Sequence, residues 1–510
     1  MSDLTDRQSA TSALAYPVGD DISAKTGSAR LSGRMGPIRL LLMVLAFSAP
    51  IVCVEGLIPL TIQFGGPGAS FAFVLTTAIL LLFSVGYVTM ARHVPKPGDF
   101  YAFISSGLGK VFGLGAAFLA VFSYLALLGG TYIFLGISTT SLITSLGGPQ
   151  TAWWIWALIG WIGVSILGYF HIELSAKVLS VSMVVEIAIV MIFNIAVLVS
   201  GGENGLSITP FTPSSFAQGD MGVTMLYAVL VFLGFEATAL FRDEVYEPTK
   251  TIPRATYGAV AFVGFLYTLS CYGLVTAFGA HAWDVAKNDP TTMFAVGIGK
   301  FVAPVFDQIT YASVILSALA ACISIHNVLS RYVLNLAADK ALPKYLSKVH
   351  ERHSSPHMAS NAVAALCGLF LLPFMLMKVN TESVYGLATG IGAIGVVALM
   401  AVVSYAVIAW FARSGIPAEE NAFKVFGAPG IAATALTLTV IFAVVHLDLV
   451  VGGTPGQYVW VVYFLIGIFV AGSLIALYFR AAKPDVYENL GRAERIFEFL
   501  AHRREQAGSD

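Results

Sequence analysis

Charged residues are scarce in this sequence. Of its 510 residues only 11% are Asp, Glu, Lys or Arg, whereas 57% are hydrophobic, and the mean hydropathy is +0.81. Charged residues make up about 25% of an ordinary soluble domain, and a globule of this size needs them to cover its surface. The composition therefore excludes a soluble protein and indicates a chain that crosses a membrane many times.

Other absences exclude further classes. All of the few cysteines lie inside apolar segments and none stands in a metal-binding pair, so we expect neither disulfides nor zinc: Cys53, Cys271, Cys322 and Cys367. No Walker-type phosphate loop is present, so direct use of ATP is not expected. The first ~36 residues are polar and contain no apolar core ahead of a cleavage site, which predicts a disordered cytoplasmic tail and no signal peptide. The net charge of −1 gives no sign of a nucleic acid partner.

Long apolar segments dominate what is present. A spanning helix needs about 20 apolar residues, and twelve segments of that length predict an all-α polytopic membrane protein: 39–63, 69–91, 113–142, 152–170, 178–199, 221–245, 256–280, 304–336, 358–378, 385–412, 428–448 and 457–480. With the amino terminus inside, 25 of the 28 Lys and Arg residues fall on the cytoplasmic side. Since basic residues accumulate there, both termini are predicted to be cytoplasmic.

The stretch from Leu226 to Ala255 has a glycine and a carboxylate in the middle of the sixth apolar segment. Gly234 lets a helix come apart, and Glu236 is an ionisable group at a depth where such groups are costly and usually functional. Secondary transporters build their substrate sites at discontinuous helices near the bilayer centre. This pattern predicts a broken sixth helix, with Glu236 as a lock on the break.

The first segment carries a matching interruption. Pro50, Glu55, Gly56 and Pro59 disturb an otherwise apolar span, and a break is expected between the two prolines because each removes an amide donor. In an inverted five-helix duplication, helices 1 and 6 occupy corresponding places, which is the pairing that points to a transporter site. An ordinary proline kink without a ligand is the alternative.

Three further polar residues are candidates within the membrane. Glu186, in the fifth segment, is either a proton site or a partner in a structural hydrogen bond. Tyr124, in the third, either lines a cavity or packs in the core. His326, in the eighth, either contacts substrate or pairs with a neighbouring helix.

Two segments near the cytoplasmic side have an amphipathic pattern. Residues 101–108 predict a short surface helix between the second and third spans. The segment after Ala481 has apolar residues spaced among charges, which is typical of a helix lying on the inner leaflet, although a solvated helix has the same pattern.

Three stretches resemble the amino acid–polyamine–organocation transporter superfamily, in its amino acid permease branch: GFEATALFRDEVYEPTKTIPRA, SRYVLNLAADKALPKYLSKVHERHSSP and PKPGDFYAFISSGLGKVFG. The resemblance implies a LeuT-like fold of two inverted five-helix repeats, with helices 1 and 6 unwound, plus two peripheral helices. It divides the chain into a tail (1–38), helices 1 to 5 (39–199), helices 6 to 10 (200–412), helices 11 and 12 (413–480) and a cytoplasmic tail (481–510).

In this family, amides of the helix 1 break hold a substrate carboxylate and carbonyls of the helix 6 break hold its amine. The matching positions are Val52, Cys53, Val54, Glu55 and Gly56 in helix 1, and Val231, Phe232, Leu233 and Gly234 in helix 6. The family's Gly-Ser-Gly signature is absent from helix 1. Glu55 beside the anion pocket disfavours a carboxylate and suits an amine, and Glu186 stands where some members have a lysine tied to proton coupling.

The sequence therefore predicts no enzyme but a secondary transporter for an amino acid or small organic amine in the cytoplasmic membrane, with proton symport. Its substrate site combines the two breaks with Tyr124 and His326. An amino acid/amine antiporter is the nearest alternative, and a nutrient sensor or a channel is the alternative from another class. No cofactor or metal is expected, sodium stays open as the coupling ion because helix 8 carries serines, and the carrier is a monomer or homodimer in the lipid bilayer.

Overall fold

The computed structural model describes residues 36–94, 100–170, 176–348, 356–376, 381–451, 454 and 456–491. These residues belong to one compact unit, Gly33–Ile496, which is described by itself. Within the described ranges every regular element is a helix. The prediction of an all-α membrane protein is confirmed for this part of the chain.

The elements of the first half are α1 (Pro37–Ser48), α2 (Pro50–Val52), the π-helical turn η1 (Cys53–Leu57), α3 (Ile58–Gly65), η2 (Gly66–Gly68), α4 (Ala69–His93), α5 (Phe100–Leu108), α6 (Lys110–Ser145), α7 (Trp153–Tyr169), α8 (Ala176–Ser200), η3 (Thr209–Phe211), α9 (Pro213–Phe216), α10 (Met221–Leu230) and the 3₁₀ segment η4 (Phe235–Glu244).

The elements of the second half are α11 (Pro248–Phe278), η5 (Gly279–His281), α12 (Ala282–Asn288), α13 (Met293–Phe301), α14 (Val305–Ala338), η6 (Lys344–Ser347), α15 (His357–Leu376), α16 (Thr381–Ser414), the π-helical turn η7 (Phe423–Gly427), α17 (Ala428–Val445), α18 (Leu447–Val451), α19 (Val459–Ala482) and α20 (Pro484–Asn489).

Ten helical stretches in the described residues are long and apolar enough to cross a membrane. All twelve predicted segments contain helix, but the segments and the spans do not correspond one to one. α7 has only 17 residues, and α1 ends after 12 residues at a break, beyond which helix runs on from Pro50 to His93 through both α3 and α4. The twelve-helix count and the inverted repeat stay predictions, while a multi-pass membrane protein is established.

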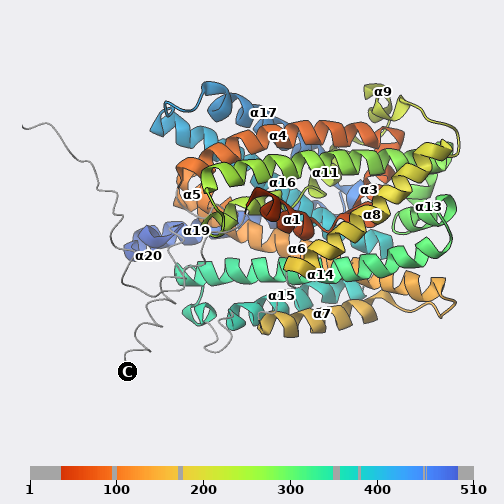
Figure 1. The fold of residues 1–510 in the computed structure, drawn as a ribbon. Coiled ribbons are helices and arrows are strands. Elements are labelled where there is room, and N and C mark those ends of the chain that lie inside the picture. The colour runs from red at the N-terminus through yellow and green to blue at the C-terminus, as the bar shows by residue number, and fades with distance from the viewer. Residues whose placement is uncertain are drawn as a thin grey trace, which may run out of the picture. The chain divides into compact units, whose positions relative to one another are not determined.

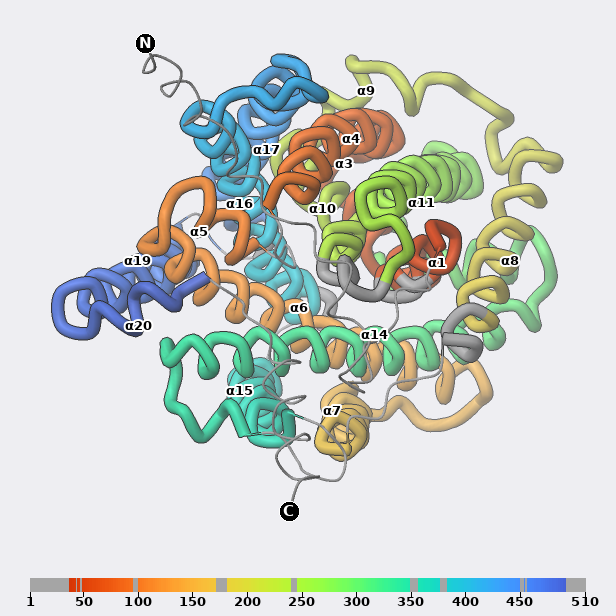
Figure 2. The backbone as a smooth tube through the Cα atoms, turned by 60° about the vertical axis from the view of Figure 1, so that its left-hand side comes forward, coloured from red at the N-terminus to blue at the C-terminus, as the bar shows by residue number. Residues whose placement is uncertain are grey.

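The broken helices lie inside the bundle (Figure 1). α1 packs against α8 and α11, and α10 packs against α3, α4, α16 and α17. α6 and α14 pack along each other, and α7 and α15 pack against both of them, on the side of the bundle labelled α7 and α15 in Figure 2. α19 lies against α6. This arrangement puts both helix interruptions within the protein, where irregular backbone is tolerated at membrane depth.

Two amphipathic segments are more buried than the sequence predicts. The helix predicted over 101–108 forms as α5, but its residues Phe100 to Ile104 are buried against α6 and α16, so it is not a surface helix. Of the tail, the structure describes 481–491. There Val486 and Leu490 pack with Tyr101 and Leu114, while the rest of the predicted amphipathic segment lies outside the described residues. Apolar spacing shows that one face is covered, but not what covers it.

Candidate functional site

Helix 1 is interrupted at Ala49, between α1 and α2. Ala49 has φ 47° and ψ 70°, a left-handed conformation that a non-glycine residue rarely adopts. Pro50 explains the position, because the residue before a proline is disfavoured in the right-handed helical region and Pro50 itself starts the next helix well. Strained backbone of this kind persists where the surrounding structure fixes it, and such positions gather at functional sites.

The sequence placed the unwound residues of helix 1 at Val52 to Gly56, and this is wrong. Val52 ends α2, and Cys53, Val54, Glu55 and Gly56 lie in the π-helical turn η1, so all five keep helical hydrogen bonding. Pro59 does not break the chain because it stands near the start of α3, where its missing amide costs little. The break lies three residues earlier, and the π turn takes up the residues that were expected to unwind.

Helix 6 is interrupted where the sequence predicts. α10 ends at Leu230, residues Val231 to Gly234 turn, and a 3₁₀ segment resumes at Phe235. Gly234 has φ 117°, which side chains other than glycine's rarely permit. Phe232 and Leu233 donate their amides to the carbonyls of Val229 and Leu230, which closes the last turn of the helix.

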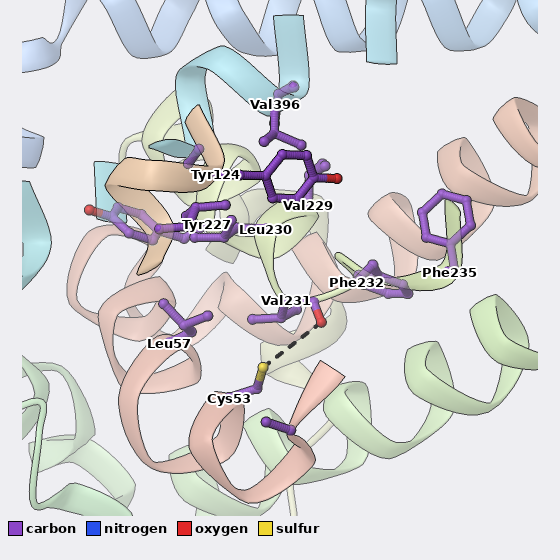
Figure 3. Close-up of a cluster of buried hydrophobic side chains, with 14 of the residues drawn as sticks. Cys53, Leu57, Tyr124, Tyr227, Val229, Leu230, Val231, Phe232, Phe235 and Val396 are labelled. Atoms are coloured by element: carbon purple, nitrogen blue, oxygen red, sulfur yellow. Dashed lines mark hydrogen bonds between the residues drawn. The ribbon is translucent and has the colours of Figure 1, made fainter. Parts of the chain in front are cut away.

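The two breaks are in contact. The Ser48 hydroxyl lies 3.5 Å and the Cys53 thiol 3.9 Å from the carbonyl oxygen of Val231, which both can use as an acceptor. Figure 3 shows the Cys53 sulfur pointing at that oxygen, with Phe232 beyond it and Tyr124, which comes from α6, near Val229. These contacts are long for hydrogen bonds, so the Val231 carbonyl has weak partners from the protein.

Glu236 bridges the helix 6 break to the bundle. Its carboxyl oxygens accept from the Gly234 amide at 2.8 Å and from the Tyr124 hydroxyl at 2.9 Å. The Tyr87 hydroxyl donates to the Glu236 backbone oxygen at 2.6 Å. The side chain is 7% exposed and both of its oxygens are bonded. This geometry is that of a lock on the interrupted helix, and it occupies the Tyr124 hydroxyl.

Glu186 of α8 reaches the helix 1 break. One carboxyl oxygen lies 3.4 Å from the Ile51 amide, and the other accepts from the Ser182 hydroxyl at 3.0 Å. Ser317 of α14 is a further polar neighbour of this carboxyl group. The carboxylate thus lies at the amino-terminal end of the helix that starts at Pro50, where the helix dipole favours an anion.

Glu55 and Gly56 point to different neighbours. Glu55 is fully buried next to α13 and α14, and neither of its carboxyl oxygens has a hydrogen-bond partner among the described residues. Gly56 faces the stacked rings of Phe134 and Tyr385. A Cβ atom here would lie 2.7 Å from the Tyr385 hydroxyl, so the close approach requires glycine.

His326 is not among the residues around the breaks. Its ring bonds the Ser360 hydroxyl of α15 at 2.8 Å and lies against Gly168 of α7. It therefore makes the interhelical hydrogen bond that the sequence left as the alternative, and its contact with substrate stays a prediction. Helical periodicity did not reveal that this face of α14 packs against α7 and α15 and not against the two breaks.

Several residues near the breaks were missed: Ser48, Ala49, Tyr87, Tyr267, Ser317 and Tyr385. Ala49 had a readable signal, since it precedes Pro50. The others are ordinary core residue types whose partners lie far away in sequence. Among the described residues, no group of three or more His, Cys, Asp or Glu side chains is arranged to hold a metal ion.

Comparison with known proteins identifies the family of this chain. Residues 39–486 match the family model described as amino acid permease. The branched-chain amino acid permease BcaP of Bacillus subtilis (strain 168) is 22% identical over 485 residues, which cover 91% of this chain and 96% of that protein. The Asc-type amino acid transporter 1 of Mus musculus is 23% identical over 303 residues, covering 56% of this chain and 55% of the relative.

A third relative is the chloroplastic cationic amino acid transporter 7 of Arabidopsis thaliana, 25% identical over 335 residues, with 60% of this chain and 54% of the relative covered. The superfamily predicted from three short stretches is confirmed by a match over most of the length. The match runs from α1 through both interrupted helices to α20. Both helix breaks fall within the matched residues, and the chain belongs to the amino acid permease family, whose members are transporters and not enzymes.

Proposed function

We propose that this protein is a secondary carrier that moves an amino acid across the cytoplasmic membrane by alternating access, in symport with protons. One observation carries the proposal: the helix 1 break at Ala49 and the helix 6 break at Val231 to Gly234 lie in contact inside the bundle. Interrupted helices at membrane depth expose backbone groups that can bind an amino acid at both of its charged ends.

The proposed site uses opposite helix ends for opposite charges. The amino-terminal end of the helix starting at Pro50 favours the substrate carboxylate, and the carbonyl end of α10 at Val231 favours its ammonium group. The Val231 carbonyl is suited to this because its protein partners are weak. Phe232 and Tyr124 are the proposed apolar walls.

Glu186 is the proposed proton site, and its position gives symport a physical reason. The carboxylate now lies at the Ile51 amide, which is part of the proposed anion pocket. A protonated Glu186 is neutral and no longer competes with the substrate carboxylate there. Proton binding and carboxylate binding therefore favour each other, as symport requires, whereas ionised Glu186 disfavours the loaded state.

The proposed substrate is an amino acid with an apolar side chain. A relative that matches over 91% of this chain is named a branched-chain amino acid permease, and the side chains around the breaks are predominantly apolar. An amine lacking the carboxylate is the second candidate, because the family's glycine signature is absent from helix 1; Glu55 is the counter-ion proposed for it. We further propose that both termini are cytoplasmic and that the carrier is a monomer or homodimer.

The test combines binding with transport. Purified protein is heated with leucine, isoleucine, valine and the matching amines, because a ligand of the folded state raises apparent stability. The same protein in liposomes is assayed for leucine uptake under a proton gradient, with and without sodium. We expect amino acids alone to stabilise, and uptake to follow the proton gradient without sodium.

Glu186→Gln tests the coupling group. We expect it to keep substrate binding and exchange but lose the dependence of uptake on pH. Glu419→Gln is the matched control, because Glu419 is exposed in the segment after α16. Uptake by Glu186→Gln that still follows the proton gradient contradicts the proton role. Uptake only in exchange for an internal amine favours an antiporter, and current without saturation favours a channel.

A further inference from the structure

Glu55 is a buried acid for which the proposed site above supplies no partner. Its side chain is 0% exposed, and both carboxyl oxygens lack a hydrogen bond among the described residues. The Ala295 backbone of α13 is its neighbouring polar group, without forming such a bond. Natural structures rarely leave buried polar atoms in this condition, so each case asks for an explanation.

The groups around Glu55 do not compensate a negative charge. The charged side chains that act electrostatically on it are both acidic, Asp289, after α12, and Asp307, in the first turn of α14, and Tyr311 of α14 is within reach of the same charges. The basic residue on α13, Lys300, pairs instead with Glu203. On the other sides of η1, α16 contributes Tyr385 next to Gly56, and α11 contributes Tyr267 next to Cys53.

An ionised carboxylate without hydrogen bonds or a cation costs several kcal/mol even after the protein relaxes. A proton removes that cost and needs no space of its own. An ammonium ion needs room within about 4 Å of the carboxylate to pair with it. Both Glu55 oxygens are closed off from any solvent-sized space, so a proton is the cation for which there is room at this carboxyl group.

Position connects Glu55 to Glu186. Ile51, whose amide faces the Glu186 carboxylate, precedes Glu55 by four residues, and a π turn needs about that number to complete one revolution. The two acids therefore lie about one turn apart along helix 1. The turn that holds Glu55 packs against α13, and the charges of Asp289 and Asp307 act on Glu55 there.

We propose that Glu55 is a second proton-binding site of the transport cycle, filled while α13 and α14 cover it and exchanging its proton when they move away. Asp289, which is exposed, and Asp307 form the acidic approach by which cations gather at this end of the pocket. The part of the inference that concerns the cycle rests on the proposed function. The protonated state of the covered pocket does not.

The experiment reads the carboxyl group directly. Full-length protein in lipid nanodiscs is titrated from about pH 5 to about pH 9, a range in which an ordinary glutamate is ionised, while its infrared spectrum is recorded. The carbonyl stretch of a protonated acid without hydrogen bonds is separate from the bands of carboxylates. We expect such a band at neutral pH, absent in Glu55→Gln and retained in Glu186→Gln and Glu236→Gln.

Asp307→Asn gives a second test that leaves Glu55 in place. Removing a neighbouring negative charge favours ionisation of Glu55, so we expect its band to disappear at lower pH than in the unchanged protein. For the cycle, Glu55→Gln should bind leucine but shift the pH profile of uptake, while Glu419→Gln leaves that profile unchanged.

Two results overturn the inference: a band unaffected by Glu55→Gln, or a protein without any such band at neutral pH. Loss of the band on adding an amine also overturns it, because the ion pair then forms and Glu55 is an amine counter-ion. If leucine is neither bound nor carried but the Glu55 band is present, the proposed function fails while the protonated pocket stands.

Discussion

The Tyr124 hydroxyl donates a hydrogen bond to the Glu236 carboxyl group at 2.9 Å, across 112 residues of sequence. The other oxygen of that carboxyl group accepts a hydrogen bond from the Gly234 amide at 2.8 Å. Tyr124 lies on the unbroken helix α6, and it thus holds the conformation of the turn between α10 and η4. The bond couples the shape of the break to the position of α6.

Removing either partner should loosen the break. Tyr124→Phe leaves a buried acceptor without its donor, which costs about 1–3 kcal/mol, and Glu236→Gln should cost a similar amount. Because the two residues share one hydrogen bond, the double variant should be less destabilised than the sum of the two single variants. Thermal unfolding of the three variants checks this. Tyr463→Phe is the control, since that tyrosine is 70% exposed, and additive effects contradict the coupling.

Gly56→Ala should lower stability and leucine uptake together. The added methyl group would lie 2.7 Å from the Tyr385 hydroxyl and 2.9 Å from the Phe134 ring, and overpacking of this kind costs about 1–3 kcal/mol. Gly430→Ala is the matched control, because nothing lies within 4 Å of its Cβ position in α17. That change should be neutral or stabilise by up to about 1 kcal/mol. Partial rescue of Gly56→Ala by Tyr385→Phe would identify the clash.

Glu420 should give the protein a stability that depends on acid pH. Its side chain is 2% exposed, and it bonds Lys424 at 2.9 Å and Arg92 at 3.1 Å. Burial acts to raise the pKa of Glu420, but the bonds to Lys424 and Arg92 outweigh it and leave the pKa below its ordinary value.

Because the folded protein has the lower pKa, this stabilisation is complete above the unfolded pKa of about 4.3 and is lost as the pH falls through the folded value. Melting temperatures measured down to about pH 3 should therefore fall less in Glu420→Gln than in the unchanged protein. Glu419→Gln should follow the unchanged protein. Parallel curves for all three would show that Glu420 does not contribute.

Leu490→Ala should release the end of the described chain without unfolding the bundle. Leu490 is 1% exposed and packs with Tyr101, and truncating such a side chain costs about 2–5 kcal/mol. The Gly491 amide, which donates to the Tyr101 hydroxyl at 2.6 Å, should then exchange its hydrogen faster. Hydrogen exchange of residues 484–491 measures this. Glu488→Ala, at an exposed position of α20, should leave exchange unchanged.

The two helix breaks show how far the sequence could be read. The helix 6 break was predictable because Gly234 is the one residue type that takes φ 117° easily, and it stands in the middle of an apolar segment. The helix 1 break was misplaced because the prediction looked for a loop between two prolines. The restriction that Pro50 puts on Ala49 was the better guide.

Partners across the bundle could not be read from the sequence. The bond of His326 to Ser360 joins α14 to α15, and that of Glu186 to the Ile51 amide joins α8 to α2, so both depend on which faces of these helices meet. Helical periodicity gives the apolar side of a helix only when one side is polar. In α14 most positions on every side are apolar, and the helix packs against several others, among them α6, α7, α13 and α15. Its few polar residues therefore do not show which neighbour each one meets.

The π turn from Cys53 to Leu57 has a mechanical consequence. A π turn holds about one residue more than an α turn, so helix 1 contains a spare residue directly beyond its break. If that turn tightens to α-helix, the residues beyond it rotate by about 100° relative to those before it. The helical register of helix 1 can thus shift by one residue while its backbone hydrogen bonds are kept.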